Sequence, residues 1–554
     1  MYQVATQFFN RVLSGFSPLQ LIGGTVAAQL AYKAIQTDWG QVKMDIQNNI
    51  FYLLKTTPYL KDLFAKELAK DFEPQLDSAD VSVHKNRTVR FTEMPDQGIA
   101  KDALLATIKS ICEFNKFGHK VSGAIYRGEE NDLSDFAAEI FKHAGYTNPL
   151  HPGLFEDIRQ CENEVIQWCA KLMHGDNNIM GCINDGGTFS ILEAVKAHKK
   201  WAKNEKSGMT RRRQPNIVVP KSAHVAFAKA AEYYDLDLIE VDLDPKTHKV
   251  DTAKLRKAVN RNTIMIVGSA PNYPHGIVDD IPALSDIALK NNCGLHVDAC
   301  LGGFLIPFMK ATGHELPLFD FRLPGVTSIS MDSHKYGYVP KGSSIGMFRK
   351  KVGLYQADFK ARWQGGLYLT PNMAGSRMGA MILMTWAILA HVGFKGYVQA
   401  TKDIMALREK VNMMFKEIPE LEVIGDPKVN VVAFRFNKAT NHNIYLLLEK
   451  MKERGWHLNG LQDPAAIHLC VTYLQTEQTN FIETFESDLK WAIEYIKKNP
   501  MEQPKGDGAT YGAMQKIPGA IAPQLLEMLG REYNFLDSRV EATRPKAVAK
   551  LKAS

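Results

Sequence analysis

Thr327-Ser-Ile-Ser-Met-Asp-Ser-His-Lys-Tyr-Gly337 places one lysine, Lys335, directly after a histidine at the end of a short run of apolar and hydroxyl side chains. Small and β-branched residues in such a run are typical of a buried strand. Upstream, the apolar run Gly294-Leu-His-Val-Asp-Ala-Cys300 contains one acid, Asp298. An unpaired charge is costly at the end of a buried strand. The two charges are therefore either ordinary strand-end residues, paired with each other, or the ligands of one shared group.

Pyridoxal phosphate (PLP) would account for both charges. Its aldehyde forms an imine with a lysine, and its ring nitrogen needs a carboxylate partner. Lys335 is the candidate imine former, because burial is expected to lower the pKa of a lysine and make it a usable nucleophile. Asp298 is the candidate partner of the ring nitrogen. Taken singly, each of the two residues is more simply interpreted as an ordinary charged residue at the end of a strand.

Short apolar segments alternate with amphipathic ones between residues 180 and 350. The predicted strands are Met180–Ile183, Asn216–Val219, Leu238–Val241, Ile264–Val267 and Leu295–Val297, and the predicted helices include Phe189–Ala202 and Asp280–Lys290. This alternation predicts an α/β fold, a mostly parallel sheet with helices on both faces. Ligands of such sheets bind at the carboxyl ends of the strands.

The pattern changes after a long predicted helix near Met378–Val392. The predicted strands Val431–Phe436 and Ile467–Tyr473, with the helices Asn443–Arg454 and Asn480–Lys498, indicate a smaller α/β domain. We therefore expect a mostly helical N-terminal segment at 1–115. A large PLP-binding domain with preceding substrate loops follows at 116–395, and a small C-terminal α/β domain with a tail at 396–554.

A phosphate needs backbone N–H groups at the start of a helix. Asp185-Gly-Gly-Thr-Phe-Ser190, between a predicted strand and helix, offers Gly187 for close approach and Thr188 as a hydroxyl donor. A Gly-Gly turn that merely caps a helix is the common alternative. His224 follows another strand, where its ring could stack on a flat cofactor, although a lone histidine is more often a helix-start or core residue.

Composition restricts the class of protein. The 554 residues carry a net charge of only +7, and their basic runs are short, so nucleic-acid binding is not expected. Seven cysteines without a C-x-x-C pair indicate a reducing compartment, with neither disulfides nor a metal site. Residues 16–35 are apolar but interrupted by polar side chains, which favours a packed or interfacial helix. We expect a cytoplasmic protein, either soluble or membrane-peripheral through this segment.

Several longer motifs carry a family resemblance. They are Gly-Gly-Thr188, Ser-Ala-His224, His-Val-Asp-Ala-Cys-Leu-Gly-Gly-Phe304, Ser-His-Lys-Tyr-Gly-Tyr-x-Pro-Lys-Gly-Ser-Ser344, Trp-Gln-Gly-Gly366 and Ala-Gly-Ser-Arg377. With them, the chain resembles the sphingosine-1-phosphate lyases from about Gly118 to about Tyr511. These are PLP enzymes of the type I aminotransferase fold, related to the group II decarboxylases. The resemblance implies retro-aldol cleavage of sphingosine 1-phosphate, or related phosphorylated sphingoid bases, to a long-chain aldehyde and phosphoethanolamine.

The resemblance also implies roles for matching positions. Lys335 carries PLP, Asp298 faces its ring nitrogen and His224 stacks on it. The cofactor phosphate is held by Gly187, Thr188, His334 and, from a second subunit, Ser376, which implies a homodimer with composite active sites. Tyr273 lies near the imine. The substrate phosphate and amino alcohol are bound by Tyr126, Asn148, His151 and Lys341, with Arg377 as a further anion contact; Lys341 is also a candidate base.

One departure from the family pattern affects the predicted phosphate loop. This chain has Asn184-Asp-Gly-Gly-Thr-Phe-Ser190 where the family usually reads Thr-Ser-Gly-Gly-Thr-Glu-Ser. Asp185 places a carboxylate where a phosphate is expected, and like charges repel. Three alternatives therefore remain: a catalytically impaired homologue acting as a binding protein, an amino-acid decarboxylase of the same fold, and a lyase for a shorter phosphorylated amino alcohol.

Overall fold

The computed structural model describes residues 94–95, 97–112, 118–127, 132–151, 153–210, 213–356, 359–370, 372–440 and 442–504. The chain divides into two compact units, residues 1–105 with 512–554, and residues 106–511. Most of the predicted helical segment 1–115, the apolar residues 16–35 and the tail beyond 504 lie outside the described residues. Apart from the first residues of one helix, the elements described below belong to the second unit.

The predicted mostly parallel sheet is confirmed. Seven strands lie in the order β1 (Ile179–Asn184), β7 (Ser344–Arg349), β6 (Val326–Met331), β5 (Gly294–Asp298), β4 (Thr263–Ser269), β2 (Asn216–Pro220) and β3 (Asp237–Val241). Neighbours from β3 to β6 are parallel, whereas β7 runs antiparallel to both β6 and β1. Two reversals give β1 the direction of the parallel strands. The loops after β1, β2, β4, β5 and β6 therefore gather at one edge of the sheet.

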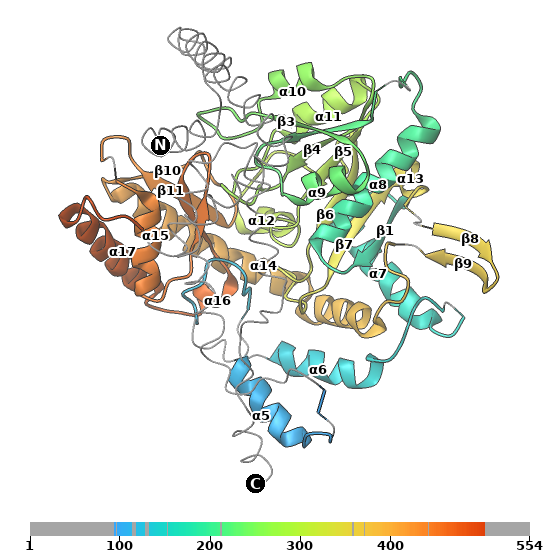
Figure 1. The fold of residues 1–554 in the computed structure, drawn as a ribbon, viewed down its shortest axis with the longest axis horizontal. Helices are drawn as coiled ribbons and strands as arrows, with labels where there is room; N and C mark the ends of the chain where they lie inside the picture. The colour runs from blue at the N-terminus through green and yellow to red at the C-terminus, as the bar shows by residue number, and fades with distance from the viewer. Residues whose placement is uncertain are drawn as a thin grey trace, which may run out of the picture. The chain divides into compact units, whose positions relative to one another are not determined.

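Helices cover both faces of this sheet. The described helices are α5 (Lys101–Ile111), α6 (Asp132–Ala144), α7 (Glu156–Leu172), α8 (Gly187–Glu205), α9 (Ala226–Tyr233), α10 (Thr252–Ala258), α11 (Ile281–Lys290), α12 (Ile306–Met309), α13 (Lys350–Gly353), α14 (Gly379–Glu417), α15 (Ile444–Glu453), α16 (Tyr473–Thr476) and α17 (Phe481–Lys498), with a 3-10 turn at Lys310–Thr312. Strand β2 shows the two-sided core, since Ile217 and Val219 pack with α8 and α9 while Val218 joins the opposite core. Figure 1 shows α8, α9, α10 and α11 beside this sheet, whereas α15 and α17 lie beside β10 and β11 of the small sheet.

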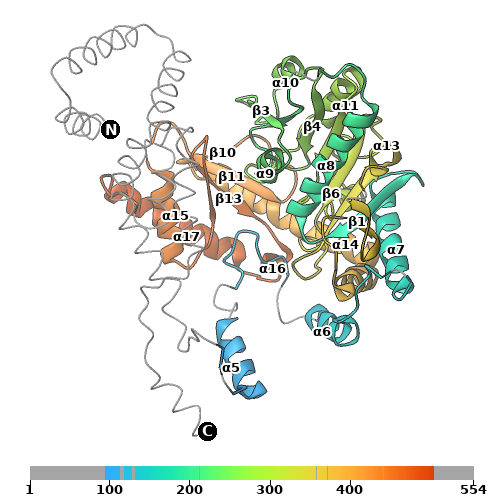
Figure 2. The same cartoon turned by 45° about the vertical axis from the view of Figure 1, so that its right-hand side comes forward.

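The C-terminal part forms the expected smaller α/β domain. Its antiparallel sheet has the order β10 (Leu421–Val423), β11 (Val431–Phe436), β13 (Ala466–Cys470) and β12 (Asn459–Leu461). Figure 2 shows β10, β11 and β13 beside α15 and α17. A separate hairpin joins β8 (Phe359–Trp363) to β9 (Gly366–Thr370).

Helix α14 connects the two domains. It is longer than predicted, and its backbone breaks from helical geometry at Gly393, where φ is 61°. By length and composition α14 is the one described helix that could cross a membrane. It packs against α6, α7 and α12, and residues such as Ile388, Ile404 and Phe415 are buried. These contacts are those of a core helix.

Candidate active site

Lys335 lies just beyond the end of β6, in a loop that also carries Asp332. The Lys335 Nζ atom is 2.9 Å from Asp332 Oδ2, and the Asp332 side chain is only 3% exposed. The ordinary interpretation of the sequence was an ion pair between Lys335 and Asp298. The structure instead pairs the lysine with the acid three residues before it.

The expectation of a lowered lysine pKa is wrong for this structure. Burial alone does lower the pKa of Lys335, as expected. The attraction of Asp332, assisted by Cys300 and Tyr126, outweighs burial and holds the pKa above its ordinary value. Lys335 is therefore an ammonium at neutral pH in the absence of cofactor, and it must lose a proton before it can attack an aldehyde.

Asp298 is the last residue of β5, the strand next to β6. Its Oδ1 accepts a hydrogen bond from the Cys300 backbone N–H at 3.0 Å, and the side chain is buried. Burial raises the pKa of the Cys300 thiol, and both Asp298 and Asp332 raise it further. Both carboxylates therefore lie near Cys300, which places Asp298 and the Lys335 loop at one end of the sheet.

The predicted phosphate loop lies at the same edge. Strand β1 ends at Asn184 and α8 begins at Gly187, with Gly186 at a φ of 104°, where glycine is favoured. Among the described residues no backbone acceptor faces the N–H groups of Gly187 and Thr188, whereas Phe189 and Ser190 donate to the Gly186 carbonyl. Two free N–H groups at a helix start suit an anion.

His334, in the loop after β6, lies beside the phosphate loop. A Cβ on Gly186 would lie 3.8 Å from His334 Cε1. The His334 Nδ1–H donates to the Ser343 carbonyl at 2.6 Å, which leaves Nε2 available. The structure thus brings His334 and the glycine loop together. Asp185, the departure from the family pattern, is exposed, and no described hydrogen bond or ion pair holds it.

These residues fit PLP. The set offers a lysine for the aldehyde, a buried carboxylate at the end of β5 and a helix start with free N–H groups. His224 stands at the carboxyl end of β2, where its Nδ1 accepts a hydrogen bond from the Ala226 N–H at 3.2 Å. The ring is half-buried and available for stacking.

Tyr126 and Lys341 lie near Lys335, and Tyr273 lies near Tyr126. The Lys341 Nζ atom is 4.5 Å from the centroid of the Tyr126 ring, which packs edge-on against Tyr336 at 5.0 Å. Burial raises the pKa of Tyr126, and the charges of Lys335 and Asp332 and the Tyr273 hydroxyl all act on it. These groups are therefore near neighbours.

Asn148, His151, Ser376 and Arg377 form a second group. The Asn148 Nδ2 donates to Ser376 Oγ at 3.0 Å, and its Oδ1 accepts from the Arg377 N–H at 3.3 Å. No described contact joins this group to Lys335, and His151 is exposed. The structure of one chain therefore separates the predicted residues into two sets.

Arg377 differs from its prediction as an anion contact. Its guanidinium pairs with both oxygens of Glu162, at 2.6 and 2.9 Å, and donates to the Ile183 carbonyl. Both side chains are buried. Glu162 thus occupies the guanidinium, and the pair joins α7 to β1 beside the phosphate loop. Sequence reasoning did not find Glu162, because nothing in the sequence relates two residues so far apart.

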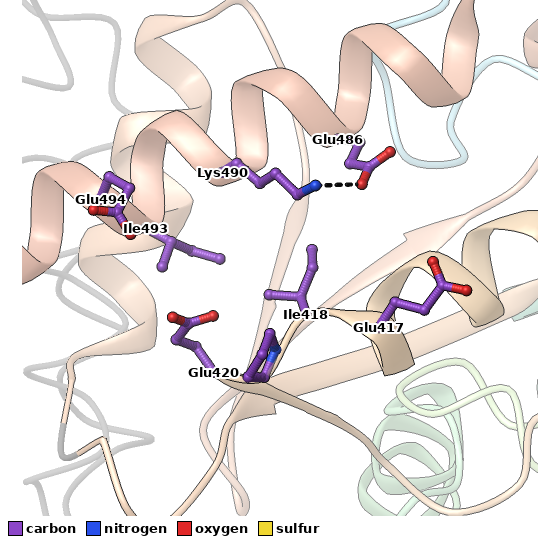
Figure 3. A pocket seen from close by; sticks show the side chains of 8 residues that line it. Glu417, Ile418, Glu420, Glu486, Lys490, Ile493 and Glu494 are labelled. Carbon is purple, nitrogen blue, oxygen red and sulfur yellow. Dashed lines mark ion pairs between the residues drawn. The ribbon is translucent and has the colours of Figure 1, made fainter.

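A separate open pocket carries none of these residues. It has a volume of about 480 Å³, lies between the end of α14 and helix α17, and is lined mainly by glutamates (Figure 3). Lys490 there is paired with Glu486 at 2.7 Å. An acidic surface of this kind repels a phosphorylated substrate, so the chemistry belongs to the Lys335 edge.

Comparison with known proteins first gives the class. Residues 151–437 match the pyridoxal-dependent decarboxylase conserved domain, and the chain is a member of this family of PLP enzymes. A glutamate decarboxylase structure from Lactobacillus brevis shares the fold, with a TM-score of 0.63 at 21% identity over 76% of this chain and 97% of that one.

Within that class the chain belongs to the sphingosine-1-phosphate lyases. It is 36% identical to the sphingosine-1-phosphate lyase of Dictyostelium discoideum over 92% of this chain and 94% of that protein. The rat sphingosine-1-phosphate lyase 1 is 37% identical over 92% and 89%. The solved structure of the Burkholderia pseudomallei enzyme gives a TM-score of 0.73 at 35% identity, covering 81% of this chain and 98% of that one.

Proposed function

We propose that this chain cleaves sphingosine 1-phosphate, or a closely related phosphorylated sphingoid base, between C2 and C3. The products are a long-chain aldehyde and phosphoethanolamine. The observation that carries the proposal is the meeting of Lys335, Asp298 and the Gly187 loop at one sheet edge, in a chain that belongs to the lyase family. When bound, PLP supplies the electron sink for the pair released from the C2–C3 bond.

The chain's residues divide the remaining work. Asp298 holds a proton on the cofactor ring nitrogen, His224 covers the ring face, and Gly187, Thr188 and His334 hold the cofactor phosphate. Lys341, beside Tyr126, binds the substrate phosphate as an ammonium. Because a phosphate dianion requires Lys341 to stay charged, we assign removal of the C3 hydroxyl proton to Lys335 Nζ, which would be a neutral amine once the substrate amine has displaced it from the cofactor. Tyr273 closes the site from the neighbouring loop.

A second subunit is part of the proposal. Ser376 is proposed to reach the partner's cofactor phosphate. Because Asn148 is hydrogen-bonded to Ser376, the two residues reach any site together. His151, close to Asn148 in the chain, would act with them on the substrate. We further propose a cytoplasmic protein, with residues 16–35 as the point of any membrane contact.

The direct test compares the full chain with Lys335→Ala. The wild type with PLP should show a visible absorbance band and release a long-chain aldehyde from sphingosine 1-phosphate. The variant should lose both, because it lacks the amine proposed to form the imine with PLP. Release of CO₂ from amino acids without aldehyde formation would instead favour a decarboxylase. Absence of the band with excess PLP would contradict the proposal and favour a non-catalytic binding protein.

A further inference from the structure

Asp332 is buried between two parts of the site, and no role was assigned to it from the sequence. Its Oδ2 is 2.9 Å from Lys335 Nζ and 3.7 Å from His334 Nε2. Among the described residues its Oδ1 is buried without a hydrogen-bond partner of good geometry, although the nearby Ser344 hydroxyl helps to lower the Asp332 pKa. A buried carboxylate with one unpartnered oxygen is costly. A purely structural acid would be expected to satisfy both oxygens.

The backbone fixes where this carboxylate lies. Asp332 is the first residue after β6, so the strand sets its position. A Cβ on Gly187 would lie 2.7 Å from Asp332 Oδ1 and 2.8 Å from Oδ2. The absence of a side chain at the start of α8 thus makes the space that the carboxylate fills. Asp332 is packed between the phosphate loop and Lys335, and it has little room to turn away from the lysine.

We propose that Asp332 is a positioning residue that holds Lys335 Nζ at the end of β6 and stabilises positive charge on this nitrogen, both in the free lysine and when the lysine is joined to PLP. The inference rests on the proposed function only in taking Lys335 as the residue that joins PLP. It gives the site a second carboxylate with a separate role, since Asp298 acts on the cofactor ring whereas Asp332 acts on the lysine nitrogen.

The surrounding charges give the direction in which Asp332 shifts the pKa of Lys335. The titratable groups that interact with the lysine nitrogen are Asp332, Cys300, Tyr126, Cys470, His334 and Lys341, the last two carrying like charge when protonated. Burial raises the pKa of the Cys470 thiol and lowers that of His334, so both are neutral near pH 8. Burial raises the pKa of both the Cys300 thiol and the Tyr126 hydroxyl, so both are neutral near pH 8. Asp332 is therefore the carboxylate that balances the lysine charge. An opposite charge this close shifts a pKa by about one to three units.

The experiment is a pH titration of the visible absorbance of PLP-loaded Asp332→Asn, a nearly isosteric change. The midpoint at which the protonated chromophore loses its proton should fall by about one to three pH units relative to wild type. Asp320→Asn is the matched control, because Asp320 is equally buried and paired with Arg322 at 2.7 Å. Its midpoint should match that of the wild type. An unchanged midpoint in Asp332→Asn would overturn the inference.

A second measurement uses only the wild-type protein, so it does not depend on whether a variant folds. In the cofactor-free wild type, the rate of Lys335 modification by a small amine-reactive probe, followed by mass spectrometry, should rise with a midpoint above that of an ordinary lysine. A midpoint at or below the ordinary value would mean that Asp332 does not hold the ammonium. Failure of the proposed function looks different, since the wild type itself would then show no visible band with PLP.

Discussion

At the scale of single residues, Lys341 gives a pH-dependent prediction. Loss of hydration and repulsion from Lys335 lower the pKa of Lys341 to about 8, although part of the side chain stays exposed. Below this value it is an ammonium, and above it the charge is lost. If Lys341 binds the substrate phosphate, KM should rise as the pH passes 8 while kcat changes little.

Lys341→Arg supplies the control for this prediction. An arginine keeps its charge throughout this range, so the rise in KM near pH 8 should disappear in steady-state assays of aldehyde release. Lys341→Gln should show a high KM at every pH. A fall in kcat with unchanged KM in Lys341→Gln would instead identify Lys341 as the catalytic base.

The residues found from the sequence share one property. Lys335, Asp298 and Gly187 each stand where a predicted strand ends or a helix begins, and parallel strands bring such positions together. Asp332 lies in the same segment as Lys335, but its role was not predicted. Parallel strand pairing suggests a partner for Lys335 on the neighbouring strand, not one three residues earlier in the same loop. The pair between Arg377 and Glu162 was not predicted, because it depends on how α7 packs, which no local pattern encodes.

At the scale of elements, the break in α14 predicts an effect on stability. Gly393 has φ 61° and ψ 172°, a region essentially restricted to glycine, and no atom of the described residues lies within 4 Å of where its Cβ would be. Gly393→Ala should therefore destabilise the protein through the backbone alone, by about 1–3 kcal/mol. Urea unfolding would measure the change.

A second glycine in the same helix serves as the comparison. Gly396 has no positive φ, and an added Cβ would meet only its own helix's Val392 side chain, at 2.9 Å. Gly396→Ala should cost less than Gly393→Ala. No measurable loss in Gly393→Ala would mean that alanine adopts this backbone conformation without strain.

The elements themselves were largely predictable from periodicity. Strands such as Thr263–Ser269 and helices such as Ile281–Lys290 follow local patterns, and Asp280 caps the latter by accepting from the Ala283 N–H. Strand β7 was not predicted, because its short antiparallel return from β6 has no intervening helix. The predicted strand Ile467–Tyr473 ends at Cys470, since Thr472 begins a capping box for α16.

At the scale of the whole molecule, one loop crosses the expected domain division. Residues 118–127 were assigned to the large domain, yet Gly123 N–H donates to the Cys470 carbonyl at 3.0 Å and Cys470 N–H donates to Ser122 Oγ at 2.9 Å. The Tyr336 hydroxyl donates to the Val471 carbonyl at 2.6 Å. Contacts with the small sheet thus position the segment that contains Tyr126 near the lysine loop. The sequence did not indicate this long-range arrangement.

Among the described residues, four buried histidines make the fold sensitive to acid. Burial lowers the pKa of His198 and His468 to about 4, and that of His275 and His296 to about 3. In the unfolded chain each titrates near 6.5. Below pH 6.5 the unfolded state therefore binds protons that the folded state excludes. Each histidine should lower the free energy of unfolding by about 1.4 kcal/mol per pH unit down to its folded pKa.

Histidine 275 isolates one of these contributions. Within the part of the chain that the structure describes, neither of its ring nitrogens has a hydrogen-bond partner, so His275→Gln removes a titrating group without breaking a described hydrogen bond. Between pH 6.5 and 5, urea unfolding of this variant should show a slope shallower by about 1.4 kcal/mol per pH unit. The exposed His143 on α6 is the control, and His143→Gln should retain the wild-type slope. Equal slopes in all three proteins would mean that His275 is protonated in the folded state, and His248 and Arg435, which face it, would then have to tolerate its charge.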